Sequence, residues 1–460
     1  MTYLRSTTAQ RQLTAIVAIF LLTLALAACD SNSSTAASTT NTPTAAGAIS
    51  TSTTASTAAN TSPTSNGAAY VSGAAGSKGV IKIAVDLPVS GAEASAGIPI
   101  RNAIELAIEQ ANAQGELIPG YKLQMYALDD AVNGVHNPQQ GVANAQAFIA
   151  DDMTVAAVGP YNSNVAKAMM PVLNDANLTM ISPSNANESL TKPQYGETAT
   201  LRPSGKVTYF RVATADDVRA PAAADYAIDK LGFKTVYVLD DQETYGKGVA
   251  KNFAARFEQR LGKESIVGRD GVPKGTSDYR TILTAIQAKN PAFVYYGGTS
   301  ANGVGLFRRQ MKDVMGSTPL MGPDGIVEGQ FLKDAGPNAE GAYGTVGVVN
   351  VGLNPKGQAF IEAYKARYSS DPGAYGPNAY EATNIIIAAI RSNAGKWGGD
   401  VAANRELVRA TIADTKAYAG ITGSVGFDQN GDTTNNSLCF YAVKDGKWAF
   451  IEQVAVSPAR

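Results

Sequence analysis

From Val80 onward, short apolar runs alternate with amphipathic segments, and this alternation constrains the fold of the 460-residue chain more than any other feature. The run 80–85 is typical of a buried strand, and apolar residues then recur at helical spacing from Ile100 to Gly115. Further strands are expected at 123–128, 155–158 and 178–181, with helices at 138–149 and after Ser163. Strands that alternate with helices form a parallel sheet with both faces covered.

The same order starts again after Arg211, which predicts a second lobe. Helices are expected at 220–231, after Gly246 and at 279–289, and strands at 236–239, near Ile266 and at 293–296. Three more helical stretches are expected at 357–367, 378–394 and 405–415. Near the end of the chain, Asp445-Gly446 is typical of the turn of a β-hairpin.

The first 28 residues have the features of an export signal. Arg5 and Arg11 precede the apolar stretch 13–27, which is short for a membrane span. The run Leu26-Ala27-Ala28-Cys29 resembles the lipobox of bacterial lipoproteins, which implies that residues 1–28 are removed and that Cys29 is acylated. An ordinary signal peptide with an incidental cysteine is the alternative.

Residues 31–78 consist almost entirely of Ser, Thr, Ala, Asn, Gly and Pro. Such a segment buries too little apolar surface to offset the entropy lost on ordering. The sequence therefore predicts a flexible tether over 29–78, starting at the acylated cysteine.

Composition argues against several classes of function. The formal net charge is −1 and no block of Lys or Arg occurs, which disfavours nucleic acid as a partner. Cys439, the only cysteine besides Cys29, lies in an apolar run and is expected to be a buried packing residue. His136 is the only histidine and is expected to be solvent-exposed in a loop, which leaves little for a Ser-His-Asp hydrolase or a multi-histidine metal site. No nucleotide-binding glycine motif is present.

Two acidic motifs have simple structural interpretations. Asp129-Asp130 follows a predicted strand, and we expect these residues to cap turns instead of forming an acid/base pair, because adjacent strand residues point to opposite faces. The run from Asp428 to Asp432 has the opening spacing of a calcium loop, but its twelfth position is Cys439 instead of Glu. A turn near the hinge is the favoured interpretation.

Ligands of open α/β sheets bind at the carboxyl ends of the strands. The loop 159–163 leaves one such strand and opens a helix, so its amides and the Ser163 hydroxyl could hold a carboxylate. Ser163 could equally serve only as the helix N-cap. Other strand-end loops that could face the same crevice are 181–186, 241–246, 297–299 and 322–324.

Residues 80 to about 450 resemble the leucine/isoleucine/valine-binding family of substrate-binding proteins for ABC transporters. The matching segments occur in family order: Ile81-Lys82-Ile83-Ala84-Val85, Ser90-Gly91, Asp129-Asp130, Met180-Ile181-Ser182-Pro183-Ser184, Asp240 to Gly248, Val294-Tyr295-Tyr296-Gly297-Gly298, Met321-Gly322-Pro323-Asp324-Gly325, Phe427-Asp428 and Gly431-Asp432. The resemblance implies a type I periplasmic binding protein, an α/β fold of two doubly wound parallel-sheet lobes joined by a three-crossing hinge. The crossings are expected near 211–214, 346–350 and 426–428, with 79–212 plus 349–426 as lobe 1 and 213–348 plus 427–460 as lobe 2.

The resemblance also implies a ligand site. Ser163, helped by the amides around Asn162, would hold the carboxylate of an amino acid, while Asp324 and the carbonyl of Ser184 would hold the ammonium. Tyr245 would lie against the ligand. A buried acid without a cation is costly, so these matches favour a zwitterionic ligand.

Three positions in this expected site depart from the family. Ala186 stands where the amino-acid binders carry a threonine, and Ala96 and Thr299 stand where they carry aromatic rings. Without those rings the pocket is wider, and leucine is not the obvious ligand. A bulkier or more polar amino acid, an amide or an organic acid remains open. The family's cysteine pair is also absent, with Val132 and Asn162 at those places.

Together these features predict an extracytoplasmic solute-binding lipoprotein and not an enzyme. It would capture an amino acid or similar small solute by lobe closure and deliver it to an ABC permease. We expect a monomer that is anchored to the membrane through Cys29 and that needs no cofactor or metal. The alternative is a sensory or regulatory protein that binds a small amide or organic acid, because the same fold serves receptors.

Overall fold

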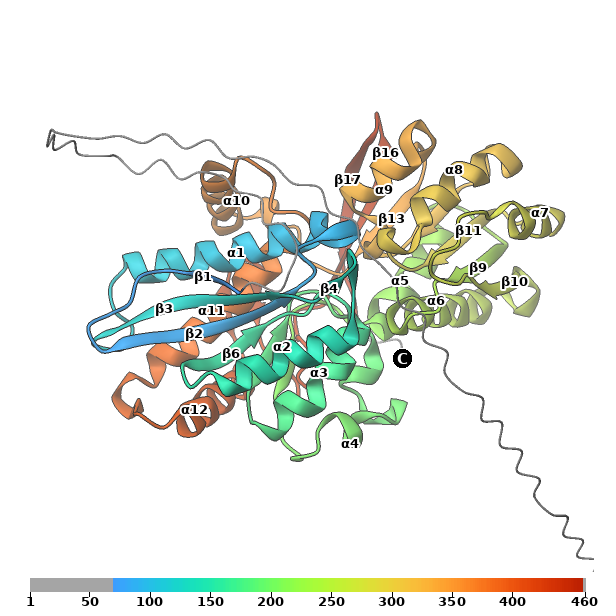
Figure 1. The fold of residues 1–460 in the computed structure, drawn as a ribbon. Helices are drawn as coiled ribbons and strands as arrows, with labels where there is room; N and C mark the ends of the chain where they lie inside the picture. Colours follow the sequence, from blue (N-terminus) through green and yellow to red (C-terminus); the bar gives the residue numbers. More distant parts are fainter. Residues whose placement is uncertain (1–68, 458–460) are drawn as a thin grey trace, which may run out of the picture. The chain divides into compact units, whose positions relative to one another are not determined.

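The computed structural model describes residues 69–457, which form two parallel-dominated sheets with helices on both faces (Figure 1). The predicted signal segment 1–28, the lipidation residue Cys29 and the tether up to residue 68 lie outside the described residues. The two sheets confirm the predicted α/β fold of two doubly wound lobes.

The first sheet has the order β1-β3-β2-β6-β7-β8, and every neighbouring pair except β1–β3 is parallel. Its strands are β1 (Tyr70–Ser72), β2 (Gly79–Leu87), β3 (Tyr121–Asp129), β6 (Thr154–Val158), β7 (Thr179–Ser182) and β8 (Tyr209–Arg211). In β2, Ile81 and Ile83 belong to one hydrophobic cluster and Ala84 to another, on the opposite side of the sheet. Both sides of this sheet are therefore buried.

Helices from two parts of the sequence cover the first sheet. The first cluster also holds residues of α1 (Ala94–Ala113), α10 (Pro355–Tyr368), α11 (Gly376–Ser392) and α12 (Val401–Ala413). The opposite cluster holds residues of α2 (Pro138–Ala150) and α3 (Ser163–Asp175). Five of the six lie within four residues of the helices expected from the sequence, and α1 begins six residues before Ile100.

The second sheet has the order β10-β9-β11-β12-β13-β16-β17. Its strands are β9 (Val236–Asp240), β10 (Ile266–Gly271), β11 (Phe293–Gly297), β12 (Leu320–Gly322), β13 (Tyr343–Val346), β16 (Ser437–Lys444) and β17 (Lys447–Ala455). The first five strands in that order pair in parallel, and β16 and β17 add an antiparallel hairpin at one edge. Asp445 and Gly446, both with positive φ, make its turn as predicted.

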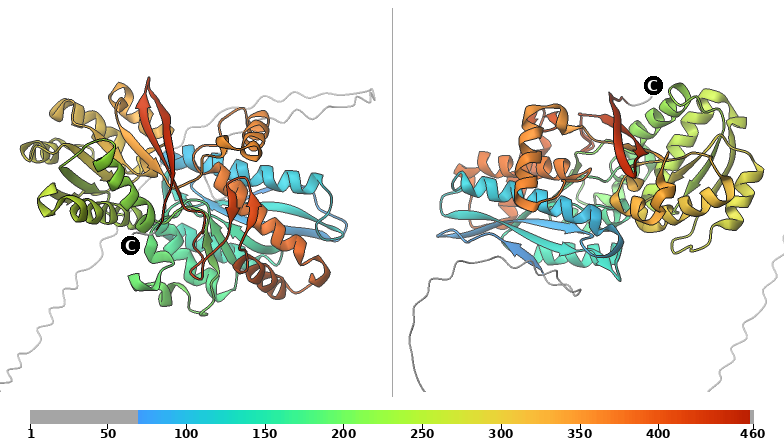
Figure 2. Two further views of the ribbon diagram at one scale, coloured as in Figure 1. Left: turned by 180° about the vertical axis from the view of Figure 1, so that it is seen from behind. Right: turned by 90° about the horizontal axis from the view of Figure 1, so that it is seen from above.

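Helices also lie on both faces of the second sheet (Figure 2). Residues of α5 (Asp216–Asp229) and α6 (Thr244–Leu261) form one buried cluster. Residues of α7 (Arg280–Ala288), α8 (Val304–Met315) and α9 (Gly329–Ala335) form the other. The remaining short strands and α-helix are β4 (Ala131–Val132), β5 (Val135–His136), α4 (Thr198–Leu201), β14 (Tyr418–Gly420) and β15 (Gly423–Val425).

The predicted tether ends earlier than residue 78. Residues 70–72 form β1, which pairs antiparallel with β3. The Tyr70 hydroxyl donates to Glu105 at 2.8 Å, and the Arg101 guanidinium lies 5.3 Å from the centre of the Tyr70 ring. Tyr70 and Val71 are strand-forming residues at the end of a Ser/Thr-rich segment, so this part of the expected tether belongs to the sheet edge.

The chain passes between the sheets three times, after β8, after β13 and before β16. Phe427 packs against Phe210 in the first lobe, with ring centroids 5.0 Å apart, and Asp432 bridges to Arg211. The chain therefore joins the second sheet only at Ser437, later than the expected crossing at 426–428. The limits of the two lobes stay a prediction.

The prediction that His136 is exposed is wrong. Its side chain is only 2% exposed, and its Nδ1 lies 2.7 Å from Oε2 of Glu93. The two short strands β4 and β5 pair with each other and place the histidine at their base. The fold therefore uses the single histidine of the chain as a buried polar partner.

The two aspartates at the end of β3 differ from each other. Asp129 caps the turn as predicted, because its Oδ1 accepts from the amides of Val89 and Ala131. Asp130 is fully buried, and burial raises the pKa of its carboxyl well above the ordinary value. The expectation of turn capping holds for the first residue only.

The aspartate-rich turn before β16 is also structural. Asp428 Oδ1 accepts from the amides of Asn430 and Asp432 at 2.8 and 2.9 Å. Within residues 69–457, no group of three His, Cys, Asp or Glu side chains is arranged to hold a metal ion.

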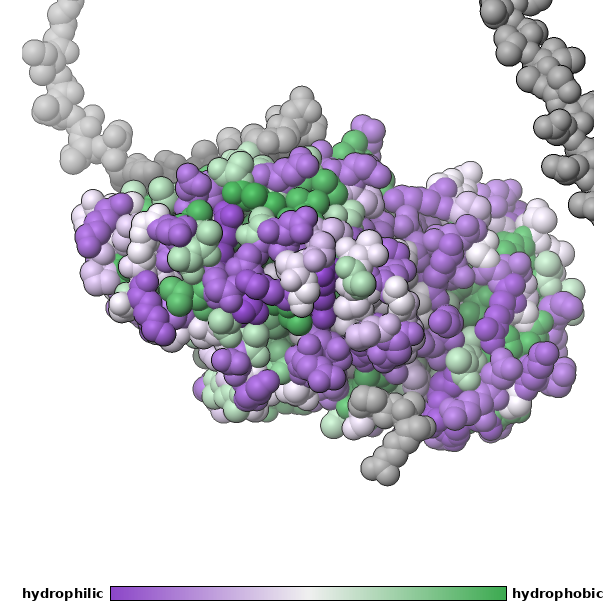
Figure 3. Space-filling view, turned by 90° about the horizontal axis from the view of Figure 1, so that it is seen from below, coloured by the Kyte–Doolittle hydropathy of each residue, from purple (hydrophilic) through white to green (hydrophobic). Residues whose placement is uncertain are grey.

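One face of the molecule carries mostly hydrophilic side chains with hydrophobic ones in small groups (Figure 3). Among the described residues, no helix combines the length and apolar character needed to cross a bilayer.

Candidate functional site

The candidate site begins at the loop between β6 and α3. Asn162 occupies the N-cap position of α3, and Ser163 is the first helical residue. The alternative that Ser163 is only the N-cap is therefore wrong. The Asn162 side-chain amide donates to Oε1 of Glu93 at 3.1 Å instead of capping the helix. The positive end of the α3 dipole thus remains available to an anion.

A hollow between the two lobes is lined by residues from four strand-end loops and the first turns of α3 and α6. The lining residues are Tyr161, Asn162, Ser163, Ser184, Tyr245, Thr299, Asp324 and Gly325. Six of the eight site residues expected from the sequence are in this set. Their meeting follows from the two parallel sheets, whose strand ends face one another across the hinge.

The other two expected residues lie elsewhere. Ala96 lines a neighbouring hollow that shares Tyr161 and Asp324 with the first. Ala186 is fully buried, and its carbonyl accepts from the amide of Asp216 at 2.7 Å. Ala186 thus supports the start of α5, and among the described residues it does not belong to the lining of either hollow.

The lobes touch across this site. The hydroxyl of Tyr161 in the first lobe bonds to Oε1 of Glu328 in the second, and the Asn164 amide donates to Glu243 at 2.7 Å. The free volume of the hollow is about 20 Å³, close to what one water molecule needs. A solute can therefore enter only when the lobes move apart or side chains move aside.

Asp324 is paired with one cation and accepts from two hydroxyls. Its Oδ1 lies 2.7 Å from Nη2 of Arg219 and accepts from the Tyr245 hydroxyl at 2.5 Å. Its Oδ2 accepts from the Tyr375 hydroxyl of the first lobe. The protein itself therefore supplies a cation to this buried acid.

Arg219 reaches Asp324 from the first turn of α5. Its Nε donates to Oδ1 of Asp216 at 2.8 Å, and its side chain is 2% exposed. Burial by itself would lower the pKa of Arg219, but Asp324 and Asp216 outweigh burial and hold that pKa well above the ordinary value. The guanidinium therefore stays charged. The Ala-rich sequence of α5 and the i, i+3 spacing of Asp216 and Arg219 were the only signals of this pair in the sequence.

Two more buried acids adjoin the hollow. Burial raises the pKa of Glu328 to about 8, against the opposing effect of the Tyr161 hydrogen bond. Burial would also raise the pKa of Glu93, but the His136 ring and the Asn162 amide outweigh it and lower that pKa. At neutral pH Glu328 is largely protonated while Glu93 is ionised. Sequence reasoning missed both acids, because neither lies in a strand-end motif.

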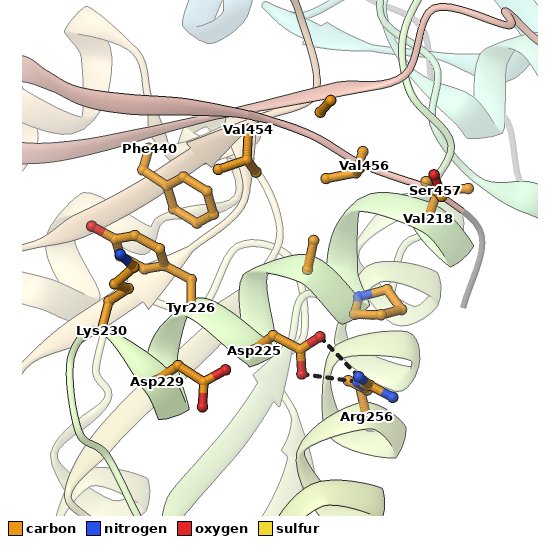
Figure 4. Close-up of a pocket in the computed structure, with 13 residues that line it drawn as sticks. Val218, Asp225, Tyr226, Asp229, Lys230, Arg256, Phe440, Val454, Val456 and Ser457 are labelled. Atoms are coloured by element: carbon orange, nitrogen blue, oxygen red, sulfur yellow. Dashed lines mark hydrogen bonds and ion pairs between the residues drawn. The ribbon is translucent and has the colours of Figure 1, made fainter. Parts of the chain in front are cut away.

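A larger hollow, of about 370 Å³, lies away from this site (Figure 4). It is an open groove between α5 and the hairpin β16–β17, where Tyr226 stacks on Phe440 with ring centroids 3.8 Å apart. Arg256 and Asp225 pair along its rim. None of the expected site residues lines it, so size alone does not identify the functional site.

Comparison with known proteins decides the family. The family model described as "Periplasmic binding protein" matches residues 80–447. The chain belongs to the periplasmic binding protein family. Proteins of this family act outside the cytoplasm.

Among curated periplasmic binding proteins, the chain is 29% identical to the Leu/Ile/Val-binding protein BraC3 of Rhizobium johnstonii, over 80% of this chain and 92% of that protein. It is also 29% identical to a leucine-, isoleucine-, valine-, threonine-, and alanine-binding protein of Pseudomonas aeruginosa, over 78% of this chain and 89% of that protein. A solved branched-chain amino acid transporter substrate-binding protein of Streptococcus pneumoniae, in complex with isoleucine, shares the fold. Its TM-score is 0.69 at 23% identity, covering 83% of this chain and 100% of that one.

Proposed function

We propose that this periplasmic binding protein captures an amino acid or a similar small solute between its lobes and delivers it to an ABC permease. The observation that supports this most is the set of six predicted residues from both lobes around one hollow. The two curated relatives are named as binding proteins for leucine, isoleucine and valine, and one of them also for threonine and alanine, which agrees with a solute of that size.

Lobe closure would supply the trapping mechanism. A ligand that touches both lobes favours the closed form over the open one, because contacts to the second lobe exist only after closure. The protein also makes polar contacts of its own between the lobes. The Tyr161 hydroxyl bonds to Glu328, and the Asn164 amide bonds to Glu243. The carboxylate of a ligand would face the first turn of α3 at Ser163.

The lipid anchor belongs to the same proposal. Acylation of Cys29 would hold the protein at the outer face of the membrane, and the segment between Cys29 and β1 would set how far the lobes extend from that membrane. Mass spectrometry of the N-terminal peptide from native membranes tests this. A mature chain that starts at Cys29 with a diacylglyceryl group is expected, and a chain with free Cys29 in the soluble fraction would contradict it.

The binding function is tested by a thermal-shift screen of the full chain against amino acids, amides and organic acids, followed by calorimetry with the compounds that stabilise it. Ser163→Ala should weaken binding by more than tenfold, because it removes a hydroxyl at the anion end of the site. Ser424→Ala, at an exposed serine, is the matched control and should leave the Kd unchanged. Equal Kd values for both variants would remove this site from the proposal.

Transport is distinguished from sensing in cells. Deletion of the gene should abolish uptake of the radiolabelled solute, and the intact gene should restore uptake. Normal uptake together with loss of a transcriptional response to the solute would favour the sensory alternative.

A further inference from the structure

The acid expected to hold a ligand's ammonium is already occupied within the protein. The Asp324 carboxylate lies 2.7 Å from the Arg219 guanidinium and accepts from two tyrosine hydroxyls. A carboxylate has about four lone-pair sites, so three partners leave little room for a further donor. The cost of burying Asp324 is met here without any charge from a ligand.

Arg219 is fixed in this role from several sides. Its Nε bonds to Asp216, its Nη1 lies 3.3 Å from the Tyr375 hydroxyl, and its guanidinium lies 5.5 Å from the centre of the Tyr245 ring. Burial raises the pKa of Asp216 to about 7, so near neutral pH a large share of molecules carries Asp216 uncharged. In those molecules the full charge of Arg219 is matched by Asp324.

An ammonium placed against Asp324 would therefore meet a guanidinium already paired with Oδ1 of the same carboxylate. Both cations would be screened from water, because Asp324 and Arg219 are 6% and 2% exposed. Like charges repel most strongly in such surroundings. At the other end of the hollow, the α3 N-terminus offers backbone amides and a positive dipole end to an anion. The Glu93 carboxylate near that end is already paired with His136 and the Asn162 amide.

On this basis, and resting on the proposed solute-binding function, we propose that Arg219 acts as a built-in counter-ion that takes the place of a ligand ammonium. The ligand class is then a small carboxylate without an amino group. Arg219 becomes the residue that sets specificity between zwitterionic amino acids and simple organic acids.

The test compares matched ligands on the unmodified full chain by calorimetry: leucine with 4-methylpentanoate, and phenylalanine with 3-phenylpropionate. In at least one pair, the acid without the amino group should bind more than tenfold tighter. Equal or tighter binding of the amino acids would overturn this inference and leave the proposed function intact. Binding of neither class would overturn both. Tighter binding of 4-methylpentanamide than of 4-methylpentanoate would overturn the choice of a carboxylate.

A second measurement addresses Arg219 itself. Arg219→Gln removes the counter-ion, so the ratio of the two Kd values in the responsive pair should shift at least tenfold toward the amino acid. Arg256→Gln, whose ion pair with Asp225 lies at the distant groove, is the control and should leave the ratio unchanged. An unchanged ratio in folded Arg219→Gln would overturn the role of Arg219. If that variant does not fold, the comparison on the unmodified chain still decides the ligand class.

Discussion

The Nε of Arg211 donates to Oδ1 of Asp432 at 2.7 Å, and this ion pair joins the last strand of the first sheet to the turn before the third crossing. The Arg211 side chain is completely buried, and its Nη1 also donates to the carbonyl of Asn187 at 2.7 Å. Burial by itself would lower the pKa of Arg211, but Asp432 outweighs burial and raises it. The hinge is thus held by a buried pair in which both groups are charged.

Asp432→Ala should therefore destabilise the protein strongly. Removing one partner of a buried ion pair leaves an uncompensated charge, which costs about 3–5 kcal/mol. The free energy of unfolding in urea measures the loss. Asp278→Ala is the control, because the Asp278–Arg280 pair is 62% exposed on both sides, and its effect should stay within about 0.5 kcal/mol. Similar losses in both variants would contradict the structural role of the Arg211–Asp432 pair.

The stability of the protein should fall as pH rises from about 5 to 8. Burial raises the pKa of Glu328 to about 8 in the folded state, above the ordinary value of a glutamate. In this range the folded protein keeps a proton that the unfolded chain releases, so each pH unit lowers the free energy of unfolding by up to about 1.4 kcal/mol for this group. Asp86, Asp216 and Glu381, with pKa values raised to about 7 by burial, add to the same trend.

Glu328→Gln isolates the contribution of Glu328 to the pH dependence of the free energy of unfolding. The variant keeps an acceptor for the Tyr161 hydroxyl but has no carboxyl proton to release. Between pH 5.5 and 7.5 its free energy of unfolding should therefore fall by about 1–3 kcal/mol less than that of the native chain. Urea unfolding at the two pH values measures the difference. Glu340→Gln, at an exposed glutamate, should follow the native pH dependence. A steeper fall in Glu328→Gln would show that the sign is wrong.

Asn164→Ala should weaken ligand binding without affecting the folding of either lobe. The Asn164–Glu243 hydrogen bond crosses between the lobes, so its loss should disfavour the closed form by about 0.5–1 kcal/mol and raise the Kd about two- to fivefold. Calorimetry with the solute found in the screen measures this. Gln330→Ala removes a bond of similar length to Asp334 within α9 and should leave the Kd unchanged. An unchanged Kd in Asn164→Ala would mean that this bond does not contribute to closure.

Gly246→Ala should disturb the start of α6 next to Tyr245. A Cβ at this position would lie 2.1 Å from Oδ1 of Asp241 and 2.6 Å from the carbonyl oxygen of Gly297, so atoms must shift. Overpacking of this kind costs about 1–3 kcal/mol. Gly329→Ala, where a Cβ meets open space, is the control and should be neutral or slightly stabilising. Thermal unfolding compares the two variants. Equal melting temperatures would show that the loop at the start of α6 shifts to accommodate the added Cβ at little cost.

The elements of the fold were largely predictable, because they depend on local periodicity. Apolar spacing located α2 and α11 within a few residues, and Asp445-Gly446 located the hairpin of β16 and β17. Errors arose where distant residues decide the outcome. Strand β1 forms because an edge of β3 is free to pair with it, and His136 is buried because Glu93 lies beside it.

The sequence by itself determined the alternation of strands and helices in two lobes and the places where the strands end, since both follow from the hydrophobic pattern along the chain. Only the tertiary structure decided the charge at that site. Arg219 and Asp324 are more than a hundred residues apart in the chain, and Tyr375 comes from the other lobe. A buried acid is paired with a cation of the protein only if packing brings that cation within about 3 Å. Local sequence carries no information on which distant side chains packing brings together.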